Sequence, residues 1–442
     1  MSVTTPDLAL PLRDRPWGLA TLWLILVGGF FFVSYLGSLE LVALRDDVPV
    51  LVFGWERHIP FLAWTIMPYW SIDLFYALAF FLCLTRAELF GLVRRLLSAQ
   101  IIAVTIFLIA PLKLTSTIPA ETGIFAPFFA ALEGVVGKPY NMAPSLHIAL
   151  LVILWAFYAR HVPRRWHWVM HLWALLIGVS VLTANQHHVF DVPTGAALGL
   201  FCVWLWPADR PSPLGSVRLT RHAKRLKLSA AYAFGAAFCI VVAIRIGGWT
   251  LWLLWPALSL TLVSLAYLGL GPTAFQKGEN GRMSLAARWL FWPYLLAARV
   301  NAWAWTRGLA TTPIAPGIRL GRLADSADAD TVLDLSAELP SPGAKGTTIA
   351  LPMLDLVAPS PAELARAAQA LERLRGTHPS SEVLVCCALG YSRSAAVVAV
   401  WLAAFGGHAS AEGAITHVRA RRQQVVLGSA LTANVSAALR TT

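Results

Sequence analysis

Long apolar runs alternate with short polar connections through most of the chain. Stretches apolar enough and long enough to cross a bilayer occur eight times before residue 271. They lie at about 17–39, 66–85, 97–112, 144–160, 166–184, 191–207, 228–246 and 249–270. Runs of this length predict membrane-spanning helices. The pattern therefore predicts a multi-pass α-helical membrane bundle of about eight spans.

Two further apolar segments differ from these runs. The segment VPVLVFGWERHIPFLAWTIMPYW is aromatic and interrupted by proline, which favours an interfacial segment over a helix through the core. Residues 284–307 mix Trp, Phe and Arg at helical spacing. Because Arg288, Arg299 and Arg307 interrupt this second segment, we expect a helix lying in the cytoplasmic interface, with a ninth span as the alternative.

The pattern becomes that of a soluble protein from about residue 308. TVLDLSAE, TTIALPMLDL and EVLVCC predict short buried strands, PSPAELARAAQALERLRG predicts an amphipathic helix capped by Ser360, and SRSAAVVAVWLAAFG predicts a second helix. This alternation predicts a small soluble α/β domain. We expect a helical bundle at 1–227, two more transmembrane helices and the interfacial helix at 228–306, and the α/β domain at 307–442.

Composition and charge support a membrane protein. Only 13% of the 442 residues are charged, 19 are Trp, and the mean hydropathy is +0.63. Basic residues fall on alternate connections: Arg13 and Arg15; Arg86, Arg94 and Arg95; Arg160, Arg164 and Arg165; 218–227; and Lys277, Arg282 and Arg288. By the positive-inside rule these connections and both termini are cytoplasmic, which predicts location in the cell (inner) membrane.

The net charge of +12 reflects this bias, and we expect no nucleic-acid partner because the basic clusters flank apolar spans.

The five cysteines argue against a disulfide scaffold. Cys83, Cys202 and Cys239 lie singly within apolar runs, as small hydrophobic residues. Cys386 and Cys387 are adjacent and lack the spacing of a metal site. We expect no metal and no cofactor, and the sequence leaves the oligomeric state open.

A candidate catalytic loop occurs in the segment VLVCCALGYSRSA. Five residues separate Cys387 from Arg393, between a predicted strand and a predicted helix. Free N–H groups and the dipole at a helix N-terminus stabilise an anion and favour the thiolate of a cysteine placed there. An arginine can fork onto two phosphate oxygens. The loop therefore predicts attack on a phosphomonoester through a phosphocysteine, with Asp355 of ALPMLDL as proton donor.

On these motifs the last 130 or so residues resemble the dual-specificity branch of the protein tyrosine phosphatase superfamily. The resemblance implies that Cys387 is the nucleophile, that Arg393 grips the phosphate, and that Asp355, in its LP-x-x-D context, is the general acid. It also implies that the hydroxyl of Ser394 assists departure of the thiolate. One position departs from the family, because the residue before the nucleophile is usually His and is Cys386 here, which changes the surroundings of the thiolate.

The interior of this loop is neutral. Its residues are the expected phosphate-binding positions Ala388, Leu389, Gly390, Tyr391 and Ser392. Members of the superfamily that act on polyphosphoinositides commonly carry added basic residues in this loop. A loop without Lys or Arg therefore favours a substrate with a single phosphate group.

A histidine constellation lies in the apolar part of the chain. KPYNMAPSLHIALL and TANQHHVFDVPTGAALG end two outward connections, so His147, His187 and Asp191 are expected at the non-cytoplasmic ends of neighbouring spans. His187 and Asp191 are four residues apart, so the carboxylate can orient the imidazole. Such an imidazole can attack phosphorus while a second histidine protonates the leaving alcohol. His188 lies off this face and is interpreted as a neighbour.

With these two segments, residues 55–205 resemble the type 2 phosphatidic acid phosphatase superfamily, and most closely its inositolphosphotransferase and sphingomyelin-synthase-like branch. The resemblance implies that His187 is the nucleophile, Asp191 its partner and His147 the acid and base. Val181 occupies the position at which the phosphatase branch has Arg. That branch also has an Arg-Pro pair after a lysine, and this pair is absent after Lys113. The site therefore fits a phosphodiester headgroup better than a monoester. Candidate headgroup-binding residues are Lys113, Lys138, Asn141 and Ser145.

Three functions remain open from the sequence. The first is a bifunctional enzyme of phospholipid metabolism, in which the outer histidine site transfers or hydrolyses a lipid phospho-headgroup and the inner cysteine site dephosphorylates a lipid phosphate. The second is a membrane-anchored protein tyrosine or dual-specificity phosphatase with a lipid-sensing membrane domain. The third is a scaffold or transport-like module with relic sites. The expected partners are membrane lipids and a phosphorylated lipid or phosphoprotein substrate.

Overall fold

The computed structural model describes residues 15–441, which divide into two compact units at the Asp209–Arg210 bond. The division falls ahead of the expected boundary at 227/228. The helices expected at 228–306 belong to the same compact unit as the α/β part. Arg13, one of the residues used above to orient the first span, lies outside the described residues.

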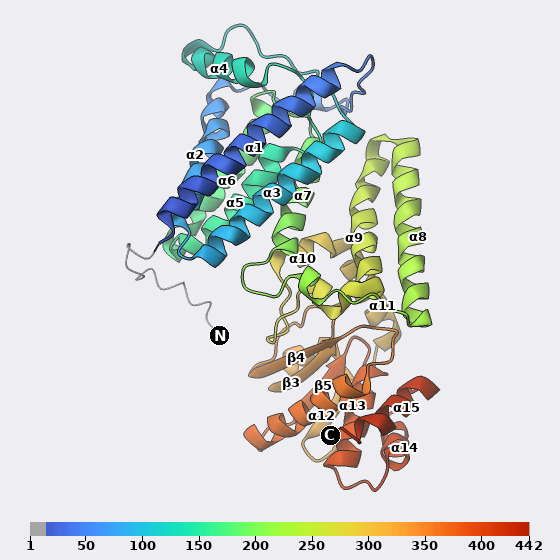
Figure 1. Cartoon of the computed structure of the whole chain (residues 1–442). Coiled ribbons are helices and arrows are strands. Elements are labelled where there is room, and N and C mark those ends of the chain that lie inside the picture. Colours follow the sequence, from blue (N-terminus) through green and yellow to red (C-terminus); the bar gives the residue numbers. More distant parts are fainter. Residues whose placement is uncertain (1–14, 442) are drawn as a thin grey trace. The chain divides into compact units, whose positions relative to one another are not determined.

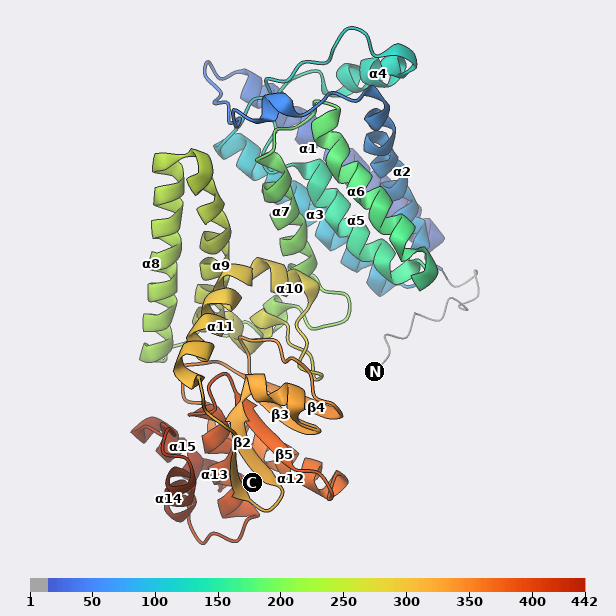
Figure 2. The ribbon, with the colours of Figure 1, turned by 180° about the vertical axis from the view of Figure 1, so that it is seen from behind.

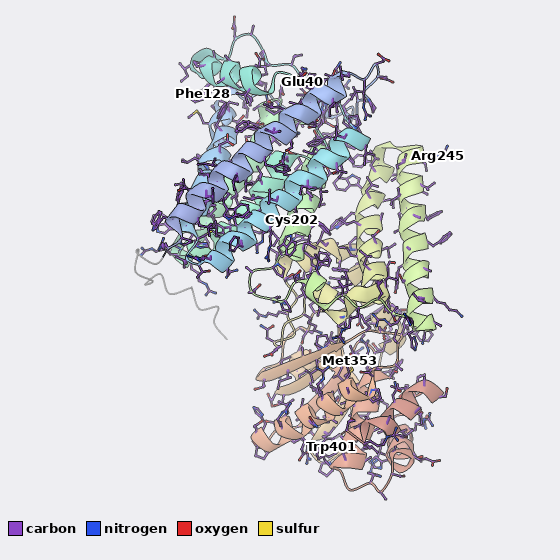
Figure 3. The ribbon with its side chains drawn as sticks, viewed as in Figure 1. Glu40, Phe128, Cys202, Arg245, Met353 and Trp401 are labelled. Carbon is purple, nitrogen blue, oxygen red and sulfur yellow. The ribbon has the colours of Figure 1, made fainter. Side chains whose placement is uncertain are left out.

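The first unit is a helical bundle. Its helices are α1 (Trp17–Ala43), α2 (Ile66–Leu82), α3 (Arg86–Ile109), α4 (Ala126–Val136), α5 (Leu146–His161), α6 (His167–Thr183) and α7 (Asp191–Leu205). All but the short α4 run side by side in both views (Figures 1 and 2). The bundle buries Phe80, Phe107 and Ile153. Cys202 also lies inside it, as expected for a small hydrophobic residue (Figure 3).

Small residues let α5 and α7 approach each other closely. A Cβ atom at Gly195 would lie 2.4 Å from the Ser145 carbonyl oxygen, and one at Gly199 would lie 2.7 Å from that of Ala149. Close packing of helices at glycine is common where both helices are apolar. The N-terminus of α7 is thereby held beside the N-terminus of α5.

Each of the eight predicted apolar runs contains a helix. Six helical segments in the described residues are long and apolar enough, by length and composition, to cross a membrane: Trp17–Ala43, Ala63–Leu82, Arg86–Ile109, Arg164–Thr183, Ala223–Ile246 and Gly248–Phe275. The shorter α5 and α7 account for the other two runs. The aromatic segment after α1 is irregular and contains the 3-10 turns η2 (Glu56–His58) and η3 (Ala63–Thr65).

The second unit begins with a helical hairpin. Helix α8 (Ala223–Ile246) packs against α9 (Leu254–Leu265), and the π-helical turn η8 (Ala266–Leu270) continues α9 (Figures 1 and 2). A hydrogen bond of 2.9 Å joins the hydroxyls of Ser229 and Ser264 between the two arms. Arg245 lies near the end of α8 that points away from the α/β part of this unit (Figure 3).

Two consecutive helices, α10 (Leu285–Leu290) and α11 (Trp292–Thr306), follow the hairpin. One face of them is exposed and apolar, at Trp289, Trp292, Leu296, Val300 and Trp303. Arginine side chains lie over two of these indoles: Arg299 is 5.8 Å from the Trp292 ring centre, and Arg307 is 5.3 Å from that of Trp303. An interfacial position for these helices stays a prediction.

The α/β part contains a five-stranded sheet in the order β1-β2-β5-β3-β4. The strands are β1 (Thr312–Ala315), β2 (Ile318–Arg322), β3 (Thr331–Ser336), β4 (Thr347–Met353) and β5 (Val383–Cys387). Only the β1–β2 pairing is antiparallel. The three predicted strands are present, and the short β1 and β2 extend the sheet beyond them. The carboxyl ends of β3, β4 and β5 meet at one edge, where ligands commonly bind in α/β folds.

Helices α12 (Pro361–Thr377), α13 (Arg393–Ala404), α14 (Ala411–Arg421) and α15 (Ser429–Ala438) complete this part. Ser360 caps α12 as expected: its hydroxyl accepts from the Glu363 N–H at 3.3 Å, and the Glu363 carboxylate accepts from the Ser360 N–H at 2.8 Å. The core between the sheet and these helices buries Leu333, Val385 and Val398 completely. This rigid layer positions the loop between β5 and α13.

Candidate functional site

The loop from Cys387 to Ser394, here called the cysteine loop, joins the end of β5 to the start of α13. The thiol of Cys387 accepts a hydrogen bond from the Gly390 N–H at 3.3 Å and lies 3.3 Å from the Ser394 hydroxyl. Gly390 has a φ of +73°, and a Cβ atom there would lie 2.4 Å from the Gly321 carbonyl oxygen of β2. Glycine is therefore required for the loop to close over the sulfur.

The two adjacent cysteines have different environments. Cys386 is completely buried in β5, beside Asp334 of β3. Burial raises the pKa of the Cys386 thiol well above its ordinary value, and the Asp334 carboxylate raises it further. Cys386 therefore stays a neutral thiol at neutral pH. Only Cys387 has its sulfur within the loop.

Arg393 is held at the start of α13 by a buried carboxylate. Its Nη1 donates to Glu338 Oε2 at 2.8 Å and its Nη2 to Oε1 at 2.6 Å, with both side chains almost fully buried. Burial alone would raise the pKa of Glu338, but the Arg393 guanidinium offsets this and holds that pKa below its ordinary value. The Nε–H of Arg393 is buried and finds no hydrogen-bond partner in residues 15–441. That donor is left for a ligand.

Asp355 lies in the loop between β4 and α12 and contacts the same guanidinium. Its Oδ1 is 3.0 Å from Arg393 Nη2, and its side chain is 26% exposed. The hydroxyl of Tyr267, in η8, donates to the main-chain carbonyl of Asp355 at 3.1 Å. The next residue, Leu356, has a φ of +58°, which a branched side chain rarely adopts. The structure thus brings Cys387, Arg393, Ser394 and Asp355 to one edge of the sheet.

The interior residues of the cysteine loop have separate contacts. Ala388 and Leu389 line a cavity of about 440 Å³. The Tyr391 hydroxyl donates to the main-chain carbonyl of Trp305, near the end of α11, at 2.6 Å. Ser392 is the N-cap residue of α13. The loop is therefore tied to α11, and the loop carrying Asp355 is tied to η8.

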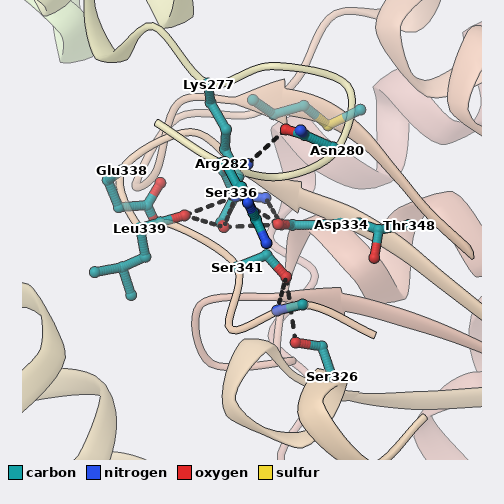
Figure 4. Close-up of polar contacts among 12 residues, drawn as sticks. Lys277, Asn280, Arg282, Ser326, Asp334, Ser336, Glu338, Leu339, Ser341 and Thr348 are labelled. Carbon is teal, nitrogen blue, oxygen red and sulfur yellow. Dashed lines mark hydrogen bonds and ion pairs between the residues drawn. The ribbon is translucent and has the colours of Figure 1, made fainter. Parts of the chain in front are cut away.

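Sequence reasoning missed three residues that position this site. Glu338 is the last residue of the predicted strand TVLDLSAE and lies two residues beyond the end of β3, and no local pattern in the sequence linked it to Arg393. Tyr267 lies within an apolar run that showed no link to the α/β part. Lys277 is completely buried, 2.5 Å from Asp334 Oδ2, and donates to the carbonyls of Ser336 and Leu339 at 2.7 Å each (Figure 4).

The histidine site lies where the N-termini of α5 and α7 meet. His187 Nδ1 is 3.1 Å from Asp191 Oδ2, and Nε2 is 3.0 Å from the Ser145 hydroxyl. A carboxylate only accepts hydrogen bonds, so Nδ1 carries the proton, and the lone pair of a neutral ring is on Nε2. The Ser145 hydroxyl donates to that lone pair. Two adjacent helix N-termini favour a bound anion at this point.

The other two histidines of these segments have distinct contacts. The His147 ring stacks on Tyr69 with ring centres 4.1 Å apart, and its Nε2 is buried without a partner in the described part of the chain. His188 Nδ1 is 3.2 Å from Glu56 Oε2, and its Nε2 accepts from the Thr115 N–H at 3.2 Å. His188 therefore ties two connections together, whereas His147 has a free nitrogen.

Of the four candidate headgroup-binding residues, only Ser145 contacts His187. Lys138 forms an ion pair with Glu40 of α1. The Asn141 amide donates to the Ser38 hydroxyl of α1 at 2.8 Å, while its Oδ1 is buried without a partner among the described residues. The Lys113 side chain is exposed. Within residues 15–441 no group of three or more His, Cys, Asp or Glu side chains is arranged to hold a metal ion.

No protein-family model matches the chain, and no curated protein matches it. Over 30% of its length it is similar to solved structures of phosphatases. They include a mouse putative dual specificity phosphatase complexed with zinc tungstate (22% identity, 87% of that chain, TM-score 0.25) and Tk-PTP in its active form (25%, 98%, 0.26). A third is PTPMT1 (16%, 95%, 0.24). With scores this low, the chemistry has to be inferred from the cysteine loop itself.

Proposed function

We propose that this protein is a membrane-bound enzyme of phospholipid metabolism whose cysteine loop hydrolyses the phosphomonoester of a lipid. The observation that carries the proposal is the arrangement around Cys387. Its sulfur lies at the N-terminus of α13, beside a fixed guanidinium that still has an unpartnered, buried Nε–H. A phosphate group bound in this loop would accept from that donor and from main-chain N–H groups.

The first chemical step forms a phosphocysteine. The thiolate of Cys387 attacks phosphorus, the S–P bond forms, and the bond between phosphorus and the ester oxygen breaks. The leaving oxygen takes a proton from Asp355 and departs as an alcohol. Asp355 is paired with Arg393 Nη2, so an incoming phosphate would compete for that donor and release the carboxyl group for this role.

The second step regenerates the enzyme. Water attacks the phosphocysteine, Asp355 takes a proton from it, and the S–P bond breaks to return a thiolate and inorganic phosphate. The Ser394 hydroxyl, 3.3 Å from the sulfur, can donate to the departing thiolate. Glu338 touches neither the sulfur nor the proton donor. It is a positioning residue that keeps Arg393 charged and oriented.

Two features favour a lipid over a phosphoprotein as substrate. The interior of the cysteine loop is neutral, which suits a single phosphate group. The loop is also attached to α11, a helix with an exposed face of Trp and Leu of the kind that lies in a bilayer interface. The alternative, a membrane-anchored protein phosphatase with a lipid-sensing bundle, shares the same chemistry and differs in the substrate.

For the first unit we propose a second activity at the opposite face of the membrane. His187 Nε2 attacks the phosphorus of a lipid phospho-headgroup, with Asp191 stabilising the charge that forms on the ring, and His147 protonates the leaving alcohol. The support is the oriented His187–Asp191 pair and the unpartnered Nε2 of His147. Transfer to an alcohol or hydrolysis by water completes the reaction. Positive-inside topology, with both termini cytoplasmic, separates the two sites by the bilayer, so direct transfer of a substrate between them is disfavoured.

Single substitutions in the full-length protein test both activities. Cys387→Ser should abolish release of phosphate from monoesters and leave headgroup transfer intact, while His187→Ala should do the reverse. Each variant is followed by lipid profiles of a deletion strain expressing it and by phosphate release from the purified protein. Equal loss of both activities in either variant would contradict two independent sites.

A further inference from the structure

A cavity of about 440 Å³ lies directly over the cysteine loop, inside the second unit. On one side it is lined by the functional loops, through Ala388, Leu389, Asp355 and Glu338. On the other side its walls come from apolar helices. This volume falls within the range of about 300–1,000 Å³ that is usual for small-molecule sites.

Helix α11 forms one wall of this cavity and has two distinct faces. Pro293, Tyr294, Ala297, Ala298, Asn301 and Ala302 line the cavity. The exposed apolar stripe described above, which includes Trp292, Leu296 and Trp303, lies on other positions of the same helix. The small side chains of Ala298 and Ala302 leave room on the cavity side. Trp and Arg on the exposed side are the residues that anchor a helix at a membrane surface.

The helical hairpin forms the remaining wall. Tyr232 of α8 and Pro256 and Leu260 of α9 line the cavity. These helices belong to segments long and apolar enough to span a bilayer. A ligand in the cavity therefore contacts, at the same time, the loops that carry the chemistry and side chains from helices suited to lipid.

The charges of the side chains that line the cavity restrict the class of ligand further. Among residues 15–441, the cavity lining includes the carboxylates of Glu338 and Asp355 and no Lys or Arg. A second phosphate group on the substrate would be repelled here. The polar, uncharged groups are Asn301, Tyr232 and Tyr294, which can contact the ester and hydroxyl groups of a lipid backbone.

We propose that this cavity is the site for the backbone and first methylene groups of a singly phosphorylated lipid. The proposal rests on the phosphomonoesterase activity proposed for Cys387 and adds the binding site and the class of substrate. The phosphate lies in the cysteine loop, the lipid backbone lies against α11, and the rest of the acyl chains remain in the membrane.

Filling the cavity tests this proposal in the full-length protein in detergent micelles. Ala298→Phe should lower kcat/KM about tenfold or more on dioctanoyl phosphatidic acid and change it less than twofold on para-nitrophenyl phosphate, which needs only the loop. Ala304→Phe is the matched control, because Ala304 is exposed on the same helix and does not line the cavity. It should leave both activities unchanged. Leu260→Trp fills the same space from α9 and should repeat the selective loss.

The outcomes separate this proposal from the proposed function. If Ala298→Phe and Leu260→Trp reduce both activities equally, or neither, the cavity is not the lipid site. If the wild-type protein cleaves para-nitrophenyl phosphate and a phosphotyrosine peptide but not the lipid, the lipid site is refuted and the cysteine chemistry stands. If Cys387→Ser leaves hydrolysis unchanged, the proposed function itself fails.

Discussion

The hydroxyl of Tyr267 donates a hydrogen bond to the main-chain carbonyl oxygen of Asp355 at 3.1 Å. Tyr267 lies in a π-helical turn at the end of the hairpin, and π-helical turns are frequent near functional sites. Asp355 is the proposed proton donor. Through this bond the apolar hairpin positions the loop that carries Asp355, although the Tyr267 hydroxyl bonds only to the backbone of that loop.

Tyr267→Phe should weaken proton donation without affecting the nucleophile. Loss of one buried hydrogen bond of about 0.5–1.5 kcal/mol corresponds to a fall in kcat of roughly two- to tenfold on alkyl phosphates, with KM preserved. The rate with para-nitrophenyl phosphate, whose leaving group needs little protonation, should change less. In an Asp355→Asn background the tyrosine substitution should have no further effect. Equal losses on both substrates would show that Tyr267 acts on the whole fold.

Glu338→Gln should destabilise the protein in a pH-dependent way. Removing one partner of a buried ion pair costs roughly 3–5 kcal/mol. The pKa of Glu338 is lowered in the folded state, so its ionised form stabilises the fold above the ordinary carboxyl pKa of about 4.3, and that contribution is lost as the pH falls below it. The difference in unfolding free energy between wild type and variant should be largest at neutral pH and shrink in acid.

The exposed pair of Arg319 and Glu382, whose nearest atoms are 3.1 Å apart, provides the control for that measurement. Glu382→Gln should cost no more than about 1 kcal/mol, because solvent screens a surface ion pair. Denaturant unfolding of both full-length variants at neutral and acidic pH makes the comparison. A Glu338→Gln variant as stable as the Glu382→Gln control would refute the structural role of the Arg393–Glu338 pair.

The adjacent cysteines should differ in reactivity. Burial and Asp334 raise the pKa of Cys386, so it lacks the thiolate that alkylation requires at neutral pH. Iodoacetamide should therefore modify Cys387 in the folded protein and reach Cys386 only after unfolding, as peptide mass spectrometry can show. Cys386→Ser should retain hydrolysis. Alkylation of Cys386 before Cys387 would contradict this assignment.

Substitutions of His187 and His188 should differ in their effect on headgroup transfer. His188 joins Glu56 to the segment of Thr115, so His188→Ala leaves a buried carboxylate without one partner and should lower the free energy of unfolding by about 1–3 kcal/mol. Headgroup transfer should persist in that variant. His187→Ala should lose transfer, and its melting temperature should also fall, because the buried Asp191 carboxylate loses a partner. Loss of transfer in His188→Ala but not in His187→Ala would assign the role of nucleophile to His188.

Much of the local structure follows from short patterns in the sequence. The strands β3, β4 and β5 and the capped helix α12 were predicted because each carries its own periodicity or cap, although β4, expected to be buried, is a partly exposed edge strand. The strands β1 and β2 were missed, since TPIA and IRLGR are short and contain proline or arginine. Helices α14 and α15 were also not predicted. Their buried positions, such as Val418 and Val435, are spread among small and polar residues.

The residues of the cysteine site also fall into those that the sequence predicted and those that it did not. Cys387 and Arg393 belong to one loop, so their spacing was visible in the sequence. Glu338 and Tyr267 reach the site through the sheet and the hairpin, and their roles depend on tertiary packing that no local pattern carries. Grouping of the hairpin with the α/β part likewise depends on contacts between distant segments, such as the bond from Tyr267 to Asp355.

The buried Lys277 limits how this protein can be divided. A fragment starting at residue 307 would lose the ammonium group that pairs with the Asp334 carboxylate and donates to the Ser336 and Leu339 carbonyls. The α/β part is therefore not a detachable module, and its soluble expression would require the chain from before Lys277. A division near residue 210, where one compact unit ends and the next begins, would keep Lys277 together with Asp334.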